Sequence, residues 1–293
     1  MAAQTENSTY MTPSTAPRLA GMGGPVKPTL LAFHGSGSNA TVHTIQLARL
    51  MRVIKDHFEV ESLEGRYPAP FPSQPGPGIL PFFEGCGPFK RWMQSSVTIS
   101  DMKAGNSTTA MPSEVEDLVR STVERITSTG GKVVGLIGFS QGTKVVAGLL
   151  KGCEIRRALA EKGSDVSRLA YLDFEFGLSV CGSYPPPLIP PSASAALDAA
   201  VSSFGMSVEE RKELMEGKIK LPAFHVQGLQ DEWNWAGQGL IDGWYEVGEG
   251  KSVVRHWEQG HLYPVQPEES QEIGEWMFGV LGRGDGKIGG EAR

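Results

Sequence analysis

Three residues in a fixed order along this chain have side chains that could together carry out acyl transfer. Ser140 lies in the sequence GFSQG at 138–142, and an aspartate and a histidine, Asp231 and His261, follow much later. A serine attacks a carbonyl carbon when a histidine takes its proton, while a carboxylate holds that histidine in the required tautomer. The residue types and their order therefore predict a serine nucleophile with a histidine base.

The surroundings of Ser140 predict a sharp turn between a strand and a helix. Residues 133–137 form a short apolar run typical of a buried parallel strand, and 143–151 continue as an apolar helix. Backbone segments crowd such a turn, so its neighbours must be small, and Gly138 and Gly142 meet that need. The N-terminus of the following helix favours an oxyanion, which makes the Gln141 N–H the expected first donor.

The second oxyanion donor is expected in the loop that follows the first strand. Residues 29–33 are an apolar run, and HGSGS at 34–38 follows directly. The Ser36 N–H is the candidate donor. His34 precedes the nucleophile in the chain, so we expect it to orient this loop and not to act as the base.

Three histidines follow the nucleophile. His225 and His256 fall inside expected strands, whereas His261 follows Gly260 in a loop beyond a strand end. From that position an imidazole can reach over the carboxyl edge of a parallel sheet, so we expect His261 to be the base.

Asp231 follows the apolar run at 223–227, again at an expected strand end, where its carboxylate could accept from the imidazole. Glu232 and Asp173 are rival acids. A turn aspartate that only bonds its own backbone is a further alternative for Asp231.

The elements that must position these residues alternate between strands and helices, which predicts an α/β fold with a mainly parallel central sheet and helices on both faces. Ser113 and Glu116 have the spacing of a capping box at the start of one helix. Expected strands lie at 29–33, 58–61, 133–137, 174–181, 223–227 and 252–257, and expected helices at 113–128, 143–151, 208–216 and 267–281. One more helix is expected after the first strand, with its apolar face at 47–54 and with Ser38 or Asn39 as its cap.

The expected domain spans 29–281, with a disordered tail at 1–28 and a polar tail at 282–293. Residues 184–221 are expected to be a lid-like insertion before the strand that bears the acid. A loop rich in Pro, Gly and Phe precedes the 113–128 helix and is a candidate wall of an apolar acyl pocket. The substrate-binding residues predicted there and near the acid are Phe71, Phe83 and Trp233.

Composition excludes several classes of function. The chain has 293 residues and a net charge of -6 without a basic stripe, which argues against nucleic acid or an anionic membrane as partner. It has no apolar stretch of eighteen residues and no signal peptide, so a cytoplasmic enzyme is expected. Its three cysteines, Cys86, Cys153 and Cys181, are far apart, which predicts reduced core residues and no metal site.

Taken together, these motifs resemble the small fungal serine hydrolases of the α/β-hydrolase superfamily. That group is related to the ovarian-cancer-associated hydrolase of animals, to polyketide-releasing thioesterases and, more distantly, to acyl-protein thioesterases. The resemblance covers 29–281, apart from an enlarged polar segment at 192–220 that puts the shape of the substrate pocket in doubt. Its markers are 33–37, 70–72, 138–142, 181–185, 225–231 and 260–261.

The resemblance implies a catalytic triad on Ser140, Asp231 and His261, with no metal or organic cofactor. It also implies hydrolysis of a small-molecule carboxylic ester or acyl thioester in fungal secondary metabolism, either as a polyketide pathway hydrolase or as a trans-acting thioesterase that meets a polyketide synthase carrier domain. A housekeeping carboxylesterase is the alternative within the class. A non-hydrolytic binding protein or cyclase on the same fold is the alternative outside it.

Overall fold

Six parallel strands form the centre of the molecule. The computed structural model describes residues 26–70, 76, 80–94, 97–203 and 205–284. Within them the sheet has the order β2-β1-β5-β6-β7-β8 and every neighbouring pair is parallel. The strands are β1 (Thr29–Phe33), β2 (Glu59–Leu63), β5 (Val133–Phe139), β6 (Phe176–Val180), β7 (Ala223–Gly228) and β8 (Val253–Trp257). This architecture confirms the predicted α/β-hydrolase fold class.

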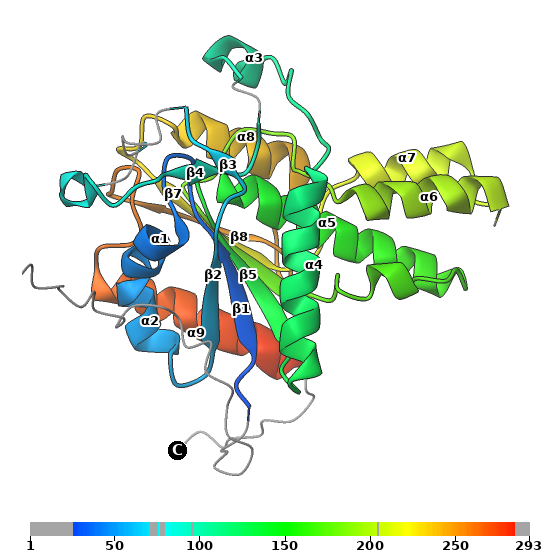
Figure 1. Cartoon of the computed structure of the whole chain (residues 1–293), viewed down its shortest axis with the longest axis horizontal. Coiled ribbons are helices and arrows are strands. Elements are labelled where there is room, and N and C mark those ends of the chain that lie inside the picture. The colour runs from blue at the N-terminus through cyan, green and yellow to red at the C-terminus, as the bar shows by residue number, and fades with distance from the viewer. Residues whose placement is uncertain (1–25, 71–75, 77–79, 95–96, 204, 285–293) are drawn as a thin grey trace, which may run out of the picture.

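Helices cover both faces of the sheet (Figure 1). On one face α4 (Ser113–Ser128) and α5 (Gly142–Glu161) bury their apolar sides, and on the other α2 (Ala48–Ile54) packs against α9 (Pro267–Gly284). The central strands β1, β5, β6 and β7 are buried along their whole length because helices lie on both sides of them. The remaining helices are α1 (Ala40–Gln46), α3 (Ile99–Lys103), α6 (Pro191–Ser203), α7 (Val208–Glu216) and α8 (Asn234–Trp244).

Smaller elements lie between β2 and α3. A two-stranded antiparallel pair, β3 (Tyr67–Pro68) with β4 (Lys90–Arg91), flanks the single-turn helix η1 (Pro81–Phe83). A second such turn, η2 (Ser167–Leu169), follows α5. The β3–β4 pair brings the aromatic loop back over the end of β1, because the Gly37 N–H donates to the Lys90 carbonyl at 2.9 Å.

Most predicted elements are confirmed, and the differences have local causes. The single helix predicted after the first strand, with its apolar face at 47–54, is two helices, because the chain turns at Leu47 between α1 and α2. Asn39 caps α1 by accepting from the Val42 N–H at 2.9 Å. The closing helix continues to Gly284, three residues beyond its predicted end.

The segment at 184–221 connects β6 to β7. It begins as a loop on α5 and continues through α6 and α7, which pack against α5 and extend to one side of the molecule (Figure 1). The ends of the predicted tails, 1–25 and 285–293, lie outside the described residues. In the part of the chain that the structure describes, no helix is long and apolar enough to cross a membrane.

Candidate active site

Ser140 occupies a strained turn directly after β5. Its backbone is left-handed, with a φ of 48°, which non-glycine residues rarely adopt. The turn is held from both sides, because the Ser140 N–H donates to the Val180 carbonyl at 3.0 Å and the Ser140 carbonyl accepts from the Thr143 N–H at 2.9 Å. A strand-to-helix turn of this shape lifts the serine hydroxyl above the carboxyl edge of the sheet.

The glycines on either side of Ser140 are required by close backbone approaches. A Cβ at Gly142 would lie 2.1 Å from the Phe33 carbonyl oxygen. A Cβ at Gly138 would lie 2.9 Å from the backbone of Gly142. Neither neighbour can move aside, since both atoms belong to the backbone of the central layers. The sequence prediction that both positions must be small is therefore confirmed.

His261 and Asp231 form a hydrogen-bonded pair beside Ser140. The distance from His261 Nδ1 to Asp231 Oδ2 is 2.7 Å, and the two side chains are 9% and 1% exposed. The other carboxylate oxygen of Asp231 accepts from the Trp233 N–H at 2.8 Å. Because a carboxylate only accepts, His261 Nδ1 must carry the proton in the neutral ring, which leaves Nε2 as the basic nitrogen.

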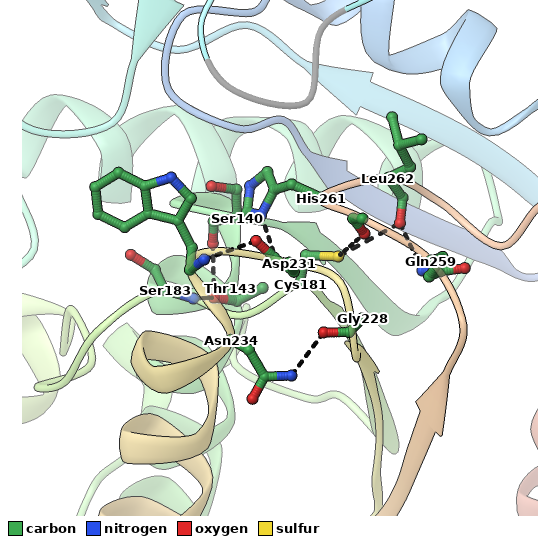
Figure 2. A network of polar contacts seen from close by, with 12 residues as sticks. Ser140, Thr143, Cys181, Ser183, Gly228, Asp231, Asn234, Gln259, His261 and Leu262 are labelled. Carbon is green, nitrogen blue, oxygen red and sulfur yellow. Dashed lines mark hydrogen bonds and ion pairs between the residues drawn. The ribbon is translucent and has the colours of Figure 1, made fainter.

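The remaining ring nitrogen of His261 faces the serine. Nε2 is buried and has no hydrogen-bond partner among the described residues, and Ser140 and His261 line the same cavity. Figure 2 shows the Ser140 side chain beside the imidazole, with Asp231 bonded to the ring's other nitrogen. The three side chains come from the carboxyl ends of β5, β7 and β8, although 121 positions separate Ser140 from His261 (261 − 140).

The loop after β1 presents Ser36 to the same cavity. A Cβ on Gly35 would lie 3.1 Å from the Cβ of Ser140, so the loop passes directly over the nucleophile. The His34 Nδ1–H donates to the Gly35 carbonyl at 2.7 Å, and His34 Nε2 accepts from the Gly65 N–H at 2.9 Å. A carbonyl only accepts and a backbone N–H only donates, so these two bonds fix a neutral ring. Burial agrees with this, because it lowers the pKa of His34 to about 4.

The orientation of the Gly35 carbonyl determines the direction of the Ser36 N–H. The two groups belong to one planar trans peptide and point in opposite directions. Because His34 holds the Gly35 carbonyl, the Ser36 N–H points away from the His34 ring, and Ser36 lines the cavity. The ring of His34 can therefore set an oxyanion donor without touching a substrate.

Trp92 joins this loop to the turn at Ser140. Its indole N–H donates to the His34 carbonyl at 2.7 Å, and its backbone N–H donates to Gln141 Oε1 at 2.7 Å. The side chain is fully buried, with its ring against Phe33 and His34. The sequence placed Trp92 in an aromatic loop but gave no signal of these two bonds, which depend on where the β3–β4 pair folds back.

The cavity has a polar end and an apolar wall. Its volume is about 250 Å³. Ser36, Ser140, Gln141 and His261 lie at the polar end. Apolar surface comes from Val97, Met102, Trp233 and Ala236, with Tyr184 and Arg91 beside them. A larger cavity of about 390 Å³ lies around Tyr67 and Glu114. Its lining residues include Ser113 and Glu114 but no histidine that could act as a base, so the smaller cavity is the candidate active site.

The aromatic residues predicted to bind substrate lie in different places. Trp233 lines the cavity. Phe83 is buried in a separate apolar cluster with Val42, Ala69 and Phe89 and is not among the lining residues, so its packing accounts for it. Phe71 lies outside the described residues.

The rival histidines and acids lie apart from the cavity. His225 is buried in β7 against the ring of Tyr245, and His256 is exposed on the edge strand β8. Asp173 pairs with Arg156 at 2.9 Å, and Glu232 is exposed.

The cysteines are free thiols, and Cys153 and Cys181 are buried as predicted, whereas Cys86 is exposed, so the prediction of a core residue is wrong there. In the described chain, one group brings possible metal ligands within 4.8 Å of one another, namely Cys181, Asp231 and His261. The 2.7 Å bond between Asp231 and His261 leaves both groups engaged with each other, and burial raises the pKa of the Cys181 thiol well above its usual range. A metal would need the thiolate form of Cys181, whereas the thiol is protonated. The bonded Asp231–His261 pair suits proton transfer better than metal ligation.

Comparison with known proteins identifies the class of this site. Residues 23–273 match the family model described as Serine hydrolase (FSH1). The chain belongs to this family. Its relatives include the esterase pigG of Monascus ruber, 29% identical over 83% of this chain and 87% of that protein. The thioesterase FSL2 of Gibberella zeae is 26% identical over 85% of this chain and 90% of that protein.

Similar solved structures include SOBER1 of Arabidopsis thaliana and acyl-protein thioesterase 2 of Zea mays. The first has a TM-score of 0.45 and 14% identity, covering 87% of this chain and 100% of the other. The second has a TM-score of 0.44 and 15% identity, covering 88% and 96%. As a member of the FSH1 family, the protein is a serine hydrolase, and esterases and thioesterases are both among its relatives.

Proposed function

We propose that this serine hydrolase cleaves a carboxylic ester or acyl thioester through an acyl-enzyme on Ser140. One observation carries the proposal: His261, bonded to the buried Asp231 at 2.7 Å, lines the same cavity as the strained Ser140. A serine, a histidine and a carboxylate in this relation form the constellation that activates a hydroxyl toward a carbonyl carbon.

In the first half of the reaction, Ser140 Oγ attacks the carbonyl carbon while His261 Nε2 takes its proton. Asp231 holds the ring and stabilises the imidazolium that forms. The tetrahedral oxyanion accepts hydrogen bonds from the backbone N–H groups of Gln141 and Ser36. Each such donor is worth about 3 kcal/mol of transition-state stabilisation.

In the second half, His261 returns its proton to the alkoxide or thiolate leaving group. Water then enters and attacks the acyl carbon while His261 takes its proton, and His261 returns that proton to Ser140 Oγ as the acid is released. These steps use side chains and backbone of this chain alone, without a metal or organic cofactor.

The cavity wall favours an acyl group with apolar character. Val97, Met102 and Trp233 offer hydrophobic surface in the same cavity as Ser140 and His261. The kinship with fungal esterases and thioesterases supports a pathway substrate, either a polyketide ester or an acyl chain on a synthase carrier domain. A housekeeping carboxylesterase is the second candidate within the class.

A fluorophosphonate probe tests the nucleophile. We expect the wild type to be labelled on Ser140 and Ser140→Ala to stay unlabelled. Ser183→Ala is the matched control, because Ser183 also lines the cavity but lies outside the proposed triad and oxyanion donors, and it should keep the label. Labelling of Ser140→Ala at the wild-type rate, or no labelling of the wild type, would contradict the proposal and favour a binding protein.

Matched acyl donors test the substrate class. Acyl-cysteamine thioesters and oxygen esters of the same acyl chain differ only in the leaving group. Turnover of the thioester, followed by release of the same acid from a carrier-bound form, supports the thioesterase role. Turnover of oxygen esters alone removes that role and leaves an esterase.

A further inference from the structure

Cys181 ends β6 in the same unusual backbone conformation as the proposed nucleophile. Its φ is 47°, and its N–H donates to the Val226 carbonyl of β7 at 2.9 Å. Glycine adopts this conformation without strain, whereas a residue with a Cβ does so at a cost. A buried non-glycine residue kept at such a position raises the question of what its side chain does.

The thiol contacts the backbone on both sides of His261. Cys181 Sγ lies 3.4 Å from the Leu262 carbonyl oxygen and 3.8 Å from that of Gly260. Figure 2 shows both contacts converging on the sulfur below the Asp231–His261 pair. The sulfur also lies within 4.8 Å of an Asp231 carboxylate oxygen and a His261 ring nitrogen. One side chain thus contacts the segments that carry the acid and the base.

The chemical state of this thiol limits what it can do. It is fully buried, and burial raises the pKa of the Cys181 thiol well above its usual range, with the charge of Asp231 adding to the effect. The thiol therefore stays protonated and neutral, so it is neither a nucleophile nor a base. A neutral S–H can donate to the neighbouring carbonyl oxygens and fill the space beneath the pair.

We propose that Cys181 is a positioning residue that holds His261 and Asp231 in line with Ser140. It does so from the end of β6, by contacting the two carbonyls that flank His261 and the carboxylate that orients it. The inference rests on the function proposed above for Ser140, Asp231 and His261. Cys181 itself contacts neither substrate nor the reacting atoms.

A second buried cysteine provides a matched control. Cys153 in α5 is also fully buried, and its Sγ donates to the Phe174 carbonyl at 3.5 Å, a contact of the same kind in the core of the fold. Replacing either cysteine by alanine removes one buried sulfur and one weak hydrogen bond. The two variants therefore differ in the segment that the lost sulfur contacted, which is the loop of His261 for Cys181 and the core of the fold for Cys153.

The experiment compares kcat, KM and the pH profile of kcat/KM for an activated ester. We expect Cys181→Ala to lower kcat by about tenfold with KM unchanged, because a shift of the base relative to the serine slows proton transfer. The acid limb of the profile should move to lower pH, since a looser pair stabilises the imidazolium less. Cys181→Ser should recover most of kcat, and Cys153→Ala should keep both kcat and the profile.

Cys181→Gly separates the effect of the thiol from the effect of the left-handed backbone conformation. It relieves the left-handed strain but lacks the sulfur, so we expect it to unfold at a higher temperature than Cys181→Ala while sharing its low kcat. This variant and Cys181→Ser keep the inference testable if Cys181→Ala fails to fold.

The outcomes distinguish this inference from the proposed function. A Cys181→Ala enzyme with wild-type kcat and pH profile overturns the positioning role and leaves the triad intact. An equal loss of kcat in Cys153→Ala also overturns it, since the effect would then be general destabilisation. If Asp231→Asn and His261→Ala both keep wild-type kcat, the proposed function itself fails and the positioning role falls with it.

Discussion

Ser140 and Cys181 directly follow the neighbouring strands β5 and β6 and have nearly the same left-handed backbone, at φ values of 48° and 47°. No other non-glycine residue in the described chain has a positive φ. Such strain costs on the order of 1–3 kcal/mol for each residue and persists only where the surrounding fold enforces it. Both positions lie at the carboxyl edge of the sheet, next to the loops that bring Asp231 and His261, so the strain is concentrated at the candidate site.

Replacing the proposed acid tests its assignment. Asp231→Asn keeps the shape of the side chain but can hold His261 in the wrong tautomer. We expect kcat for an ester to fall by about 10³- to 10⁴-fold. Glu232→Gln is the control, because Glu232 is exposed and adjacent, and it should retain wild-type kcat. A loss in Glu232→Gln with full activity in Asp231→Asn would move the role of the acid to Glu232.

The oxyanion loop can be tested through a residue that never meets the substrate. His34→Leu removes the ring that draws the Gly35 carbonyl inward, so the Ser36 N–H is no longer held toward the cavity. Loss of one oxyanion donor corresponds to a fall in kcat of roughly 100-fold, with a small change in KM. Steady-state kinetics with a soluble ester measure both constants.

His225→Leu is the control for that measurement, since His225 is a buried histidine on β7 outside the cavity. Equal losses of kcat in the two variants, or a His34→Leu enzyme that is only less stable, would show that His34 does not set the donor.

The loop after β6, which lines part of the cavity, packs its backbone closely against α5. A Cβ at Gly148 would lie 1.5 Å from the Leu188 carbonyl oxygen, so Gly148→Ala must displace the loop that continues from Tyr184. We expect the free energy of unfolding to fall by about 3 kcal/mol or more, measured by urea denaturation. Gly152→Ala in the same helix meets side-chain atoms instead of backbone, a Leu172 methyl group at 3.0 Å and the Pro190 ring at 3.3 Å, and should cost much less. Similar losses in the two variants would contradict this account of the loop.

Sequence patterns located the parts of the site that depend on chain order and local geometry. Strand ends, small residues and spacing were sufficient to bring Ser140, Asp231 and His261 to one edge of a parallel sheet, which is where the structure has them. The cap that Asn39 forms on α1 and the positions of the buried strands also follow from residue type and local sequence pattern.

Tertiary contacts were beyond the reach of these patterns. The predicted capping box at Ser113 and Glu116 is wrong, because α4 begins at Ser113 and Pro112 precedes it without a side-chain cap. Glu116 instead accepts from the Tyr171 hydroxyl at 2.7 Å. Trp92 and Cys181 are likewise defined by partners distant in sequence, so composition could identify them only as apolar core residues.

Buried histidines predict a loss of stability in mild acid. Burial lowers the pKa of His225 to about 3 and that of His34 to about 4, against 6.5 for an unperturbed ring, and holds the pKa of His43 well below its usual value. Above about pH 6.5 these rings are neutral whether the chain is folded or not. Below about pH 6.5 the histidines of the unfolded chain bind protons, whereas the buried rings of the folded chain stay neutral. The free energy of unfolding therefore falls as the pH drops from about 6.5 toward 4.

His225→Leu separates one ring from this sum. Each histidine of this kind contributes a slope of up to about 1.4 kcal/mol per pH unit, so the variant should have a flatter dependence on pH. It should be stabilised relative to the wild type more at pH 5 than at pH 7, because at pH 5 the unfolded wild-type chain gains a proton on His225 that the folded chain does not bind. Urea unfolding followed by tryptophan fluorescence at pH 7, 6 and 5 measures these slopes. Parallel curves for the variant and the wild type would mean that His225 takes up its proton without unfolding.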